Sequence, residues 1–148
     1  MGKRNKIIIG RYDVIDLPEL DIYEITAKID TGAYTSAIHC SRIKLQKEND
    51  IEYLIFKIPG SHQKKMFRVS DFKLKNIKSS SGHSETRFVI KTKVLLFGKV
   101  IKTEFSLANR SEMKFPVLLG RKLLKDRFIV DVSEINLSKI EKTQKLNP

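Results

Sequence analysis

Asp30, Thr31 and Gly32 are the residues of this sequence whose types and order best suit catalysis. Asp30 ends a segment, residues 22–30, in which apolar and polar side chains alternate as in a half-buried strand, and Thr31 and Gly32 follow it. A glycine permits a tight turn after the strand, and the threonine hydroxyl can hold that turn by hydrogen bonding. The Asp30 carboxyl group would then stand at the mouth of a sheet, where it could donate or accept a proton. A turn with a solvated aspartate fits the same three residues.

A second motif lies late in the chain, where the apolar run 117–119 leads into Gly120 and a short helix-like segment, residues 121–124. In a small barrel, such a run can pass close behind a catalytic turn and support it. Glycine suits that position because it has no side chain to keep two backbones apart. The two motifs together favour a catalytic interpretation of Asp30 over a plain turn.

Four separated stretches carry a resemblance to a known family: KIDTGAYTSAIH (28–39), SSGHSETRFVI (80–90), ANRSEMKFPVLLGRKLL (108–124) and FIVDVS (128–133). In this order they resemble the RimK-associated retropepsin-like aspartic peptidases, a family that has also been labelled as ATP-dependent zinc proteases. Its RimB members are linked to the removal of glutamate tails. The resemblance covers about residues 7–133.

The resemblance implies that Asp30 is catalytic and that Thr31 and Gly32 support it, with Gly120 as their packing partner. One chain supplies one such turn, so a two-aspartate site would need a homodimer. Two carboxyl groups a few ångströms apart share a proton, because both cannot ionise cheaply. One would take a proton from the attacking water while the other binds the peptide carbonyl oxygen. If the protein is instead a monomer, a single-aspartate mechanism aided by His83, Glu85 or Arg87 is the alternative.

The hydrophilic segment 80–87 stands where ordinary retropepsins have a flap hairpin, and it suits an acidic substrate better than an apolar one. Arginine can pair with a carboxylate through two parallel hydrogen bonds. We therefore expect glutamate-rich or poly-glutamylated peptide tails to be the substrate. The candidate substrate-binding residues are His39, Arg68, His83, Glu85, Arg87, Arg110 and Arg121. Structural roles remain open: Arg121 could pair with Asp131 or near Asp30, Arg110 could hold a loop, and Glu85 could only fix Arg87 or His83.

The net charge of +12 would attract a polyanion and could steer an acidic peptide to the site. A lysine-rich solvated surface explains the same charge. We do not expect a nucleic-acid partner, because no zinc-finger spacing, RNP-type sequence or clear helix-turn-helix is present. No apolar run approaches the ~20 residues of a membrane helix, and the start of the chain does not read as a signal peptide. A single cysteine excludes an intrachain disulfide, and we expect a cytoplasmic location.

We expect neither a metal nor a cofactor. The histidines and the cysteine show no HExxH, paired CxxC or His-x-His spacing. His39 and Cys40 are adjacent, so on a strand they would point to opposite faces. No phosphate-binding Gly-rich loop is present, so any link to ATP would come through a partner glutamate ligase. Two alternatives stay open: a zinc peptidase using His39 and His83, and a non-catalytic binder of acidic polypeptide or RNA.

These residues must be positioned by strands. Runs rich in β-branched residues recur between turn-forming clusters, and a hairpin is expected near Phe97-Gly98-Lys99. The strand-like ranges are 6–17, 21–30, 35–46, 51–59, 86–109 and 128–133, and residues 61–74 are expected to be a polar loop that runs into a further strand. One helix is expected within residues 120–128. The sequence predicts an all-β fold, a small closed retropepsin-like barrel in one domain, residues 1–135. Residues 136–148 are predicted to form a polar C-terminal tail, either frayed or a short surface helix.

Overall fold

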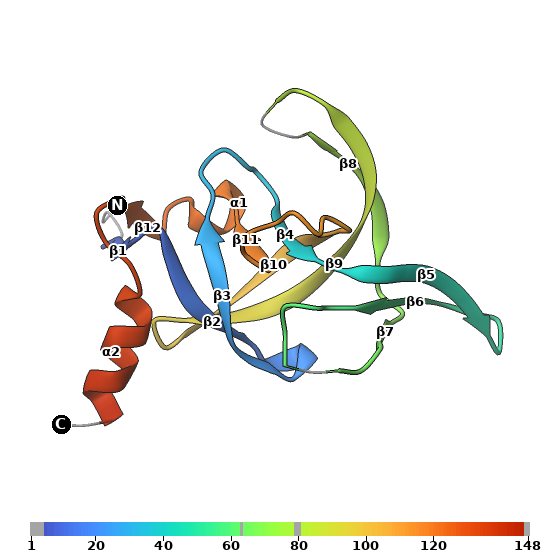
Figure 1. The fold of residues 1–148 in the computed structure, drawn as a ribbon, viewed down its shortest axis with the longest axis horizontal. Helices are drawn as coiled ribbons and strands as arrows, with labels where there is room; N and C mark the ends of the chain where they lie inside the picture. The colour runs from blue at the N-terminus through green and yellow to red at the C-terminus, as the bar shows by residue number, and fades with distance from the viewer. Residues whose placement is uncertain (1–4, 63, 79–80, 147–148) are drawn as a thin grey trace.

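The computed structural model describes residues 5–62, 64–78 and 81–146. Most of these residues lie in strands (Figure 1). The strands are β1 (Ile7–Ile9), β2 (Tyr12–Leu17), β3 (Ile22–Ile29), β4 (Ser36–His39), β5 (Ser41–Glu48), β6 (Ile51–Lys57), β7 (Phe67–Val69), β8 (Lys73–Lys78), β9 (Ser84–Leu96), β10 (Lys99–Ala108), β11 (Val117–Leu119) and β12 (Phe128–Val130). The helices are α1 (Arg121–Leu124), α2 (Leu137–Leu146) and a 3-10 turn, η1 (Pro18–Leu20). The predicted all-β class is confirmed.

The main sheet runs in the order β10-β4-β11-β3-β2-β9-β8, and β9 also pairs with β10. The pairings therefore return to their starting strand, but β2 meets β9 through one residue pair, Asp16 and Leu95. Two smaller sheets, β5-β6-β7 and β1-β12, lie outside this circuit. The architecture is thus a set of sheets around a core rather than the cleanly closed barrel that the sequence predicted.

The core sits inside the main sheet and follows from strand periodicity. In β3, the apolar side chains of Ile25, Ala27 and Ile29 are buried while their neighbours point outward. The hairpin expected near residues 97–99 forms between β9 and β10. Phe97 and Gly98 both have positive φ there, 53° and 69°, which is the backbone conformation that tight hairpin turns need.

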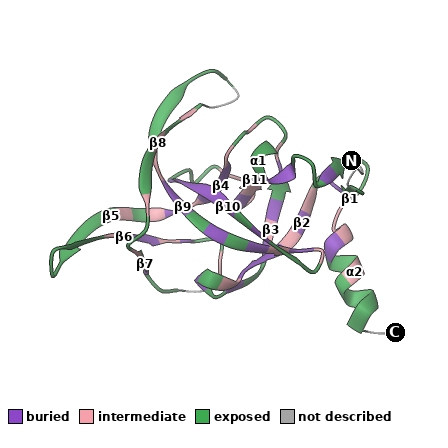
Figure 2. Ribbon diagram, turned by 180° about the vertical axis from the view of Figure 1, so that it is seen from behind, coloured by how far each residue is buried: buried purple, intermediate pink, exposed green. Residues whose placement is uncertain are grey.

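The two helical predictions have different outcomes. The late helix is shorter than the sequence suggested, because Lys125 already has an extended backbone and ends α1 after four residues. The tail forms α2, so of the two alternatives for it the surface helix is correct. Figure 2 shows α2 largely exposed, with a buried contact at Ser138. In the described residues, no helix is long and apolar enough to cross a membrane.

Candidate active site

The turn that carries Asp30 is held by backbone hydrogen bonds on both sides. The amide of Ile29 donates to Arg11 O at 2.8 Å, and that of Asp30 donates to Leu119 O at 2.9 Å. β11 lies between β3, which it pairs in parallel, and β4, which it pairs antiparallel. Ala33 N closes the turn by donating to Asp30 O at 3.2 Å. The backbone position of Asp30 is therefore fixed by the sheet and not by the loop alone.

The Asp30 carboxyl group is oriented within this turn. Gly32 N donates to its Oδ1 at 3.0 Å, and the residue is half-buried while Thr31 and Gly32 are exposed. Thr31 contributes its carbonyl oxygen, which accepts a hydrogen bond from Arg121 Nη1 at 2.9 Å. A carboxyl group held in this way and open to solvent can take a proton from a bound water.

Gly120 passes directly behind the turn. A Cβ at this position would lie 2.7 Å from Tyr34 O and 2.8 Å from Ala33 O, which is closer than any side chain tolerates. The amide of Gly120 donates to Ser36 Oγ at 3.0 Å, and the next residue, Arg121, donates its amide to Ala33 O at 2.8 Å. The close approach that the sequence predicted for Gly120 is confirmed.

Arg121 lies beside Asp30's turn. Besides its bond to Thr31 O, its guanidinium carbon lies 5.8 Å from the centre of the Tyr34 ring. Asp131, the other partner considered for Arg121, instead accepts hydrogen bonds from the hydroxyl and amide of Ser133, which lower the pKa of the Asp131 carboxyl. Arg121 thus supports the turn, and its exposed guanidinium has further donors available for a substrate carboxylate.

The β8–β9 hairpin brings a second group of the predicted residues together, and it rises at the same end of the molecule as the β3–β4 turn (Figure 1). Arg87 Nε lies 2.7 Å from Glu85 Oε1, with the Arg87 side chain 9% exposed and that of Glu85 58% exposed. Hydrogen bonding from Arg87 lowers the pKa of Glu85, and the nearby charge of Arg110 lowers it further. His83 is exposed just before β9, and Ser80 lies outside the described residues.

His39 fixes the loop that carries Arg110. Arg110 N donates to His39 Nδ1 at 3.1 Å, and Ala108 O lies 3.2 Å from the same nitrogen. Nδ1 accepts from Arg110 N when the ring proton is on Nε2, and it donates to Ala108 O when the proton is on Nδ1, so either neutral tautomer ties His39 to this loop. His39 is therefore placed to position Arg110, and Arg110 itself holds the loop through its carbonyl oxygen, which accepts from Met113 N at 3.0 Å.

Arg68 does not join these residues. It lies on β7, in the β5-β6-β7 sheet, where Nη2 is 2.6 Å from Glu48 Oε2. Its guanidinium also stacks 3.7 Å from the centre of the Tyr53 ring. The sequence missed this arrangement because Glu48 and Tyr53 are brought to Arg68 by strand pairing, and the chain's local pattern contains no sign of it.

Two of the residues considered for a metal, His39 and Cys40, have other surroundings in the structure. Within residues 5–62, 64–78 and 81–146, no three His, Cys, Asp or Glu side chains are grouped so as to hold a metal ion. Cys40 is fully buried, and burial raises the pKa of its thiol, so it behaves as a small apolar core residue. His39 Nδ1 is already engaged with Arg110.

Glu104 is a connecting residue that sequence reasoning missed. Its side chain is 5% exposed, and Lys75 and Lys122 lie 2.8 Å and 2.5 Å from Oε1, with Lys73 2.8 Å from Oε2. Burial opposes the ionisation of Glu104, but the three ammonium groups outweigh it and hold the pKa well below its ordinary value. Glu104 thereby ties β8 to α1, which supports Asp30's turn. The available signal was a lone acid within the apolar run of β10.

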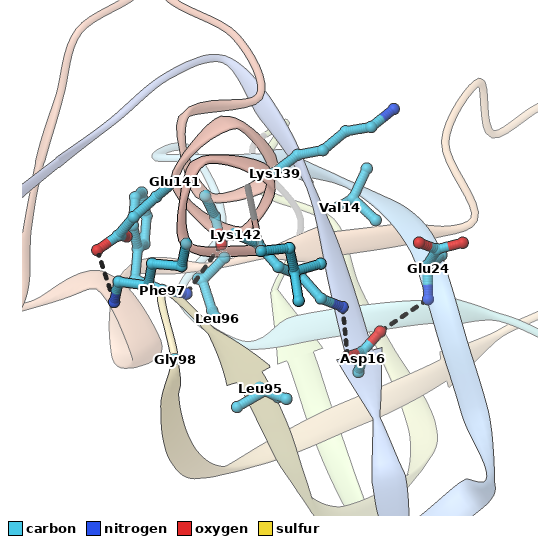
Figure 3. A pocket seen from close by; sticks show the side chains of 13 residues that line it. Val14, Asp16, Glu24, Leu95, Leu96, Phe97, Gly98, Lys139, Glu141 and Lys142 are labelled. Carbon is cyan, nitrogen blue, oxygen red and sulfur yellow. Dashed lines mark hydrogen bonds and ion pairs between the residues drawn. The ribbon is translucent and has the colours of Figure 1, made fainter. Parts of the chain in front are cut away.

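An apolar hollow in the described part of the chain lies elsewhere. It has a volume of about 220 Å³ and lies between α2 and the turn joining β9 to β10, as Figure 3 shows. Residues such as Leu96, Phe97 and Leu146 line it, and none of the predicted site residues does. The hollow is therefore separate from Asp30's turn.

A family model described as RimB-like, retropepsin-like aspartic endopeptidase RimB, matches residues 8–141. The chain belongs to the RimB-like family. In a Legionella pneumophila protein of unknown function, the crystal structure shows the same fold: the TM-score is 0.71 and the identity 26%, over 91% of this chain and 99% of that one. The resemblance stated from the four sequence stretches is thus confirmed, and the match extends into α2.

Relatives of the RimB-like chain carry a different name. This chain is 39% identical over 133 residues to a probable alpha-L-glutamate ligase of Desulfotalea psychrophila. It is 36% identical over 134 residues to a probable alpha-L-glutamate ligase of Shewanella pealeana. These matches cover 85% and 88% of this chain but 28% and 29% of the ligases. The chain therefore spans less than a third of the length of these relatives.

Proposed function

We propose that this protein is an aspartic peptidase that cleaves glutamate-rich or poly-glutamylated peptide tails, with Asp30 activating the attacking water. One observation carries the proposal: the Asp30 carboxyl group is oriented by Gly32 N on a turn that β11 and Gly120 hold from behind. Membership of a family described as aspartic endopeptidases agrees with that use of the turn. Thr31 and Gly32 act through their backbone, which fixes the carboxyl group.

The proposed reaction needs a second carboxyl group, which a homodimer would supply as the partner's Asp30. The two groups would share one proton. The ionised one takes a proton from water as the water oxygen attacks the peptide carbonyl carbon, and the protonated one donates to the carbonyl oxygen. The carboxyl group that took the water's proton then donates it to the peptide nitrogen, and the carbon–nitrogen bond breaks as one hydroxyl of the diol returns its proton to the other carboxylate. Exposed apolar side chains on the paired terminal strands, Ile8 at 51% and Ile129 at 55%, favour such an association.

An acidic substrate is favoured by the cations near the turn. Arg121 lies beside Thr31, and Arg110 lies close enough to Glu85 to lower its pKa. Arg87 is largely engaged by Glu85, so we assign it to positioning the hairpin, while Arg110 and Arg121 meet the substrate carboxylates. His83 is exposed directly before β9, and its ring is a further hydrogen-bond donor to the substrate.

The relatives named probable alpha-L-glutamate ligases suggest where such a substrate comes from. We propose that the peptidase acts on tails made by an α-L-glutamate ligase, so the bond cleaved is an α-linked Glu–Glu peptide bond. Turnover of α-linked and γ-linked oligoglutamate of equal length tests this: the α-linked chain should be cleaved and the γ-linked chain left intact. Equal cleavage of both would contradict it.

Turnover across salt concentrations tests the substrate class. Oligoglutamate should be cleaved faster than a neutral peptide of equal length, and the preference should shrink as salt screens the charges. Equal rates that do not respond to salt would contradict an acidic substrate. A chelator should leave the rate of cleavage unchanged. Loss of cleavage after chelation would indicate the zinc peptidase instead.

A further inference from the structure

The outer face of the β9–β10 hairpin carries concentrated positive charge. In the register of this pair, Lys91 lies opposite Glu104 and Lys93 lies opposite Lys102. Ile90, Thr92 and Val94 alternate with these lysines and are buried, so Lys91, Lys93 and Lys102 share the exposed face. The face lies on the outside of the main sheet, away from its core.

This charge is not balanced within the chain. Directly opposed like charges destabilise an antiparallel pair, and Lys93 and Lys102 are such a pair. Glu104 does not compensate, because its carboxylate is already shared by the ammonium groups of three other lysines. Among the described residues, the ion pairs involve none of Lys91, Lys93 and Lys102. Three lysine side chains that repel one another and have no ion-pair partner among the described residues would be stabilised by an anionic ligand.

The face is also hollowed. A cavity of about 290 Å³ is lined by Lys91, Lys102, Thr103, Glu104, Lys122 and Arg127. Arg127 uses Nη1 to donate to Leu123 O at 3.0 Å, which fixes its guanidinium beside the cavity. The wall therefore presents cationic groups from two strands and from the α1 region around a single neutralised carboxylate.

We propose that this face, comprising Lys91, Lys93, Lys102, Lys122 and Arg127 and here called the lysine face, binds an acidic stretch of polypeptide outside the catalytic turn. The inference rests on the proposed function, since the ligand is a remote part of the same acidic substrate. α1 connects the two places, because Arg121 contacts Asp30's turn and the next residue, Lys122, lines the cavity.

Strand geometry favours an extended peptide as the ligand. Side chains two apart on one strand, such as Lys91 and Lys93, are separated by about 6.6–6.8 Å. Alternate carboxylates of an extended acidic chain lie on one side with the same spacing, so every second glutamate can meet Lys91 and Lys93. The cavity lining contains no aromatic side chain on which a nucleic-acid base could stack.

Binding is measured with the full chain carrying Asp30→Asn, so that the probe is not cleaved. The probe is fluorescein-labelled decaglutamate, followed by fluorescence anisotropy. Adding Lys93→Gln and Lys102→Gln should raise Kd roughly fivefold, since each exposed pairing is weak. The matched control, Lys44→Gln with Lys47→Gln on exposed β5, removes the same charge and should change Kd less than about twofold. An equal rise in Kd in both double variants, or no rise in either, would contradict binding of the probe by the lysine face.

Turnover separates this inference from the proposed function. With Asp30 intact, Lys93→Gln with Lys102→Gln should raise KM for a long oligoglutamate, with kcat unchanged and a tetraglutamate unaffected. A protein that binds decaglutamate through the lysine face but cleaves nothing would remove the peptidase proposal and keep this one. An oligodeoxythymidine of equal charge that binds more tightly, and loses binding in the same variant, would overturn the acidic-polypeptide ligand in favour of nucleic acid.

Discussion

Asp13 lies in β2, and Asp30 directly follows the neighbouring strand β3. The two aspartates have different surroundings and different roles. The Asp13 side chain is fully buried, and its carboxyl oxygens accept hydrogen bonds from the amides of Val14, Ser138 and Lys139. Asp30 is half-buried, and its carboxyl group accepts from the amide of Gly32. Asp13 holds the start of α2 against β2, whereas Asp30 faces the solvent.

The comparison shows how partners decide what a carboxyl group can do. Burial raises the pKa of Asp13, and the amides of Ser138, Val14 and Lys139 oppose that rise. The Asp13 carboxylate oxygens already accept hydrogen bonds from backbone amides. Asp13 therefore acts as an N-cap for α2, although it is far from that helix in the sequence. Asp30 is fixed mainly through its backbone, which leaves the carboxyl group available to bind a water or a second carboxyl group.

Replacing Gly120 with alanine tests the support behind Asp30, and we expect the largest loss of stability. The added Cβ would meet the backbone of Ala33 and Tyr34, which cannot move aside without shifting the turn. We expect a loss of about 3 kcal/mol in denaturant unfolding. Gly98→Ala is the control: its Cβ meets open space and only the positive φ is strained, so about 1 kcal/mol is expected. Equal losses would mean that the close approach is unimportant.

Removing the charge of Glu104 tests the connection between β8 and α1. Glu104→Gln should cost about 2 kcal/mol at pH 7, because hydrogen bonds to a charged, buried carboxylate are lost. The folded-state pKa of Glu104 is depressed, so its stabilisation exists above the ordinary glutamate pKa and disappears as the pH falls below it. Unfolding curves of the two proteins should converge on acidification. Exposed Glu52→Gln is the control, and a difference that persists at low pH would contradict the assignment.

Asp13→Asn should destabilise the protein by about 1.5 kcal/mol, because an amide NH₂ would replace one of the two accepting oxygens. The loss should concentrate in α2, where amide hydrogen exchange becomes faster than in β9 and β10. If exchange in α2 were unchanged, the hydrogen bonds from Asp13 would not hold this helix.

Asp30→Asn should change the free energy of unfolding by less than about 0.5 kcal/mol. The asparagine oxygen can still accept from Gly32 N, and the backbone bonds that hold the turn are untouched. Denaturant unfolding of Asp30→Asn and Asp13→Asn under the same conditions compares their losses in the free energy of unfolding. A loss as large as that of Asp13→Asn would show that Asp30 is also a structural residue.

Features set by neighbouring residues could be predicted from the sequence. The alternation before Asp30, the glycine after the apolar run 117–119 and the turn at Phe97 and Gly98 each carry their own local chemistry. The family resemblance extended those signals to the order of the motifs, and the family model agrees.

Features made by distant residues could not be predicted. Asp13 meets Ser138 across 125 positions, so the carboxylate that accepts from the first amides of α2 comes from a distant strand. Glu104 gathers lysines from β8 and α1, and Arg68 finds Glu48 through strand pairing. Such contacts depend on which strands lie side by side, and a single sequence shows periodicity but not strand order.

Mass spectrometry of a poly-α-glutamate digest, run with the wild-type protein and with Asp30→Asn, tests the central claim most directly. The account predicts shorter glutamate chains, each cleavage adding one water, with the wild type and an intact polymer with the folded variant. An undigested polymer with the wild type, or equal digestion by Asp30→Asn, would contradict the assignment of Asp30 as the catalytic carboxyl group of a glutamate-tail peptidase.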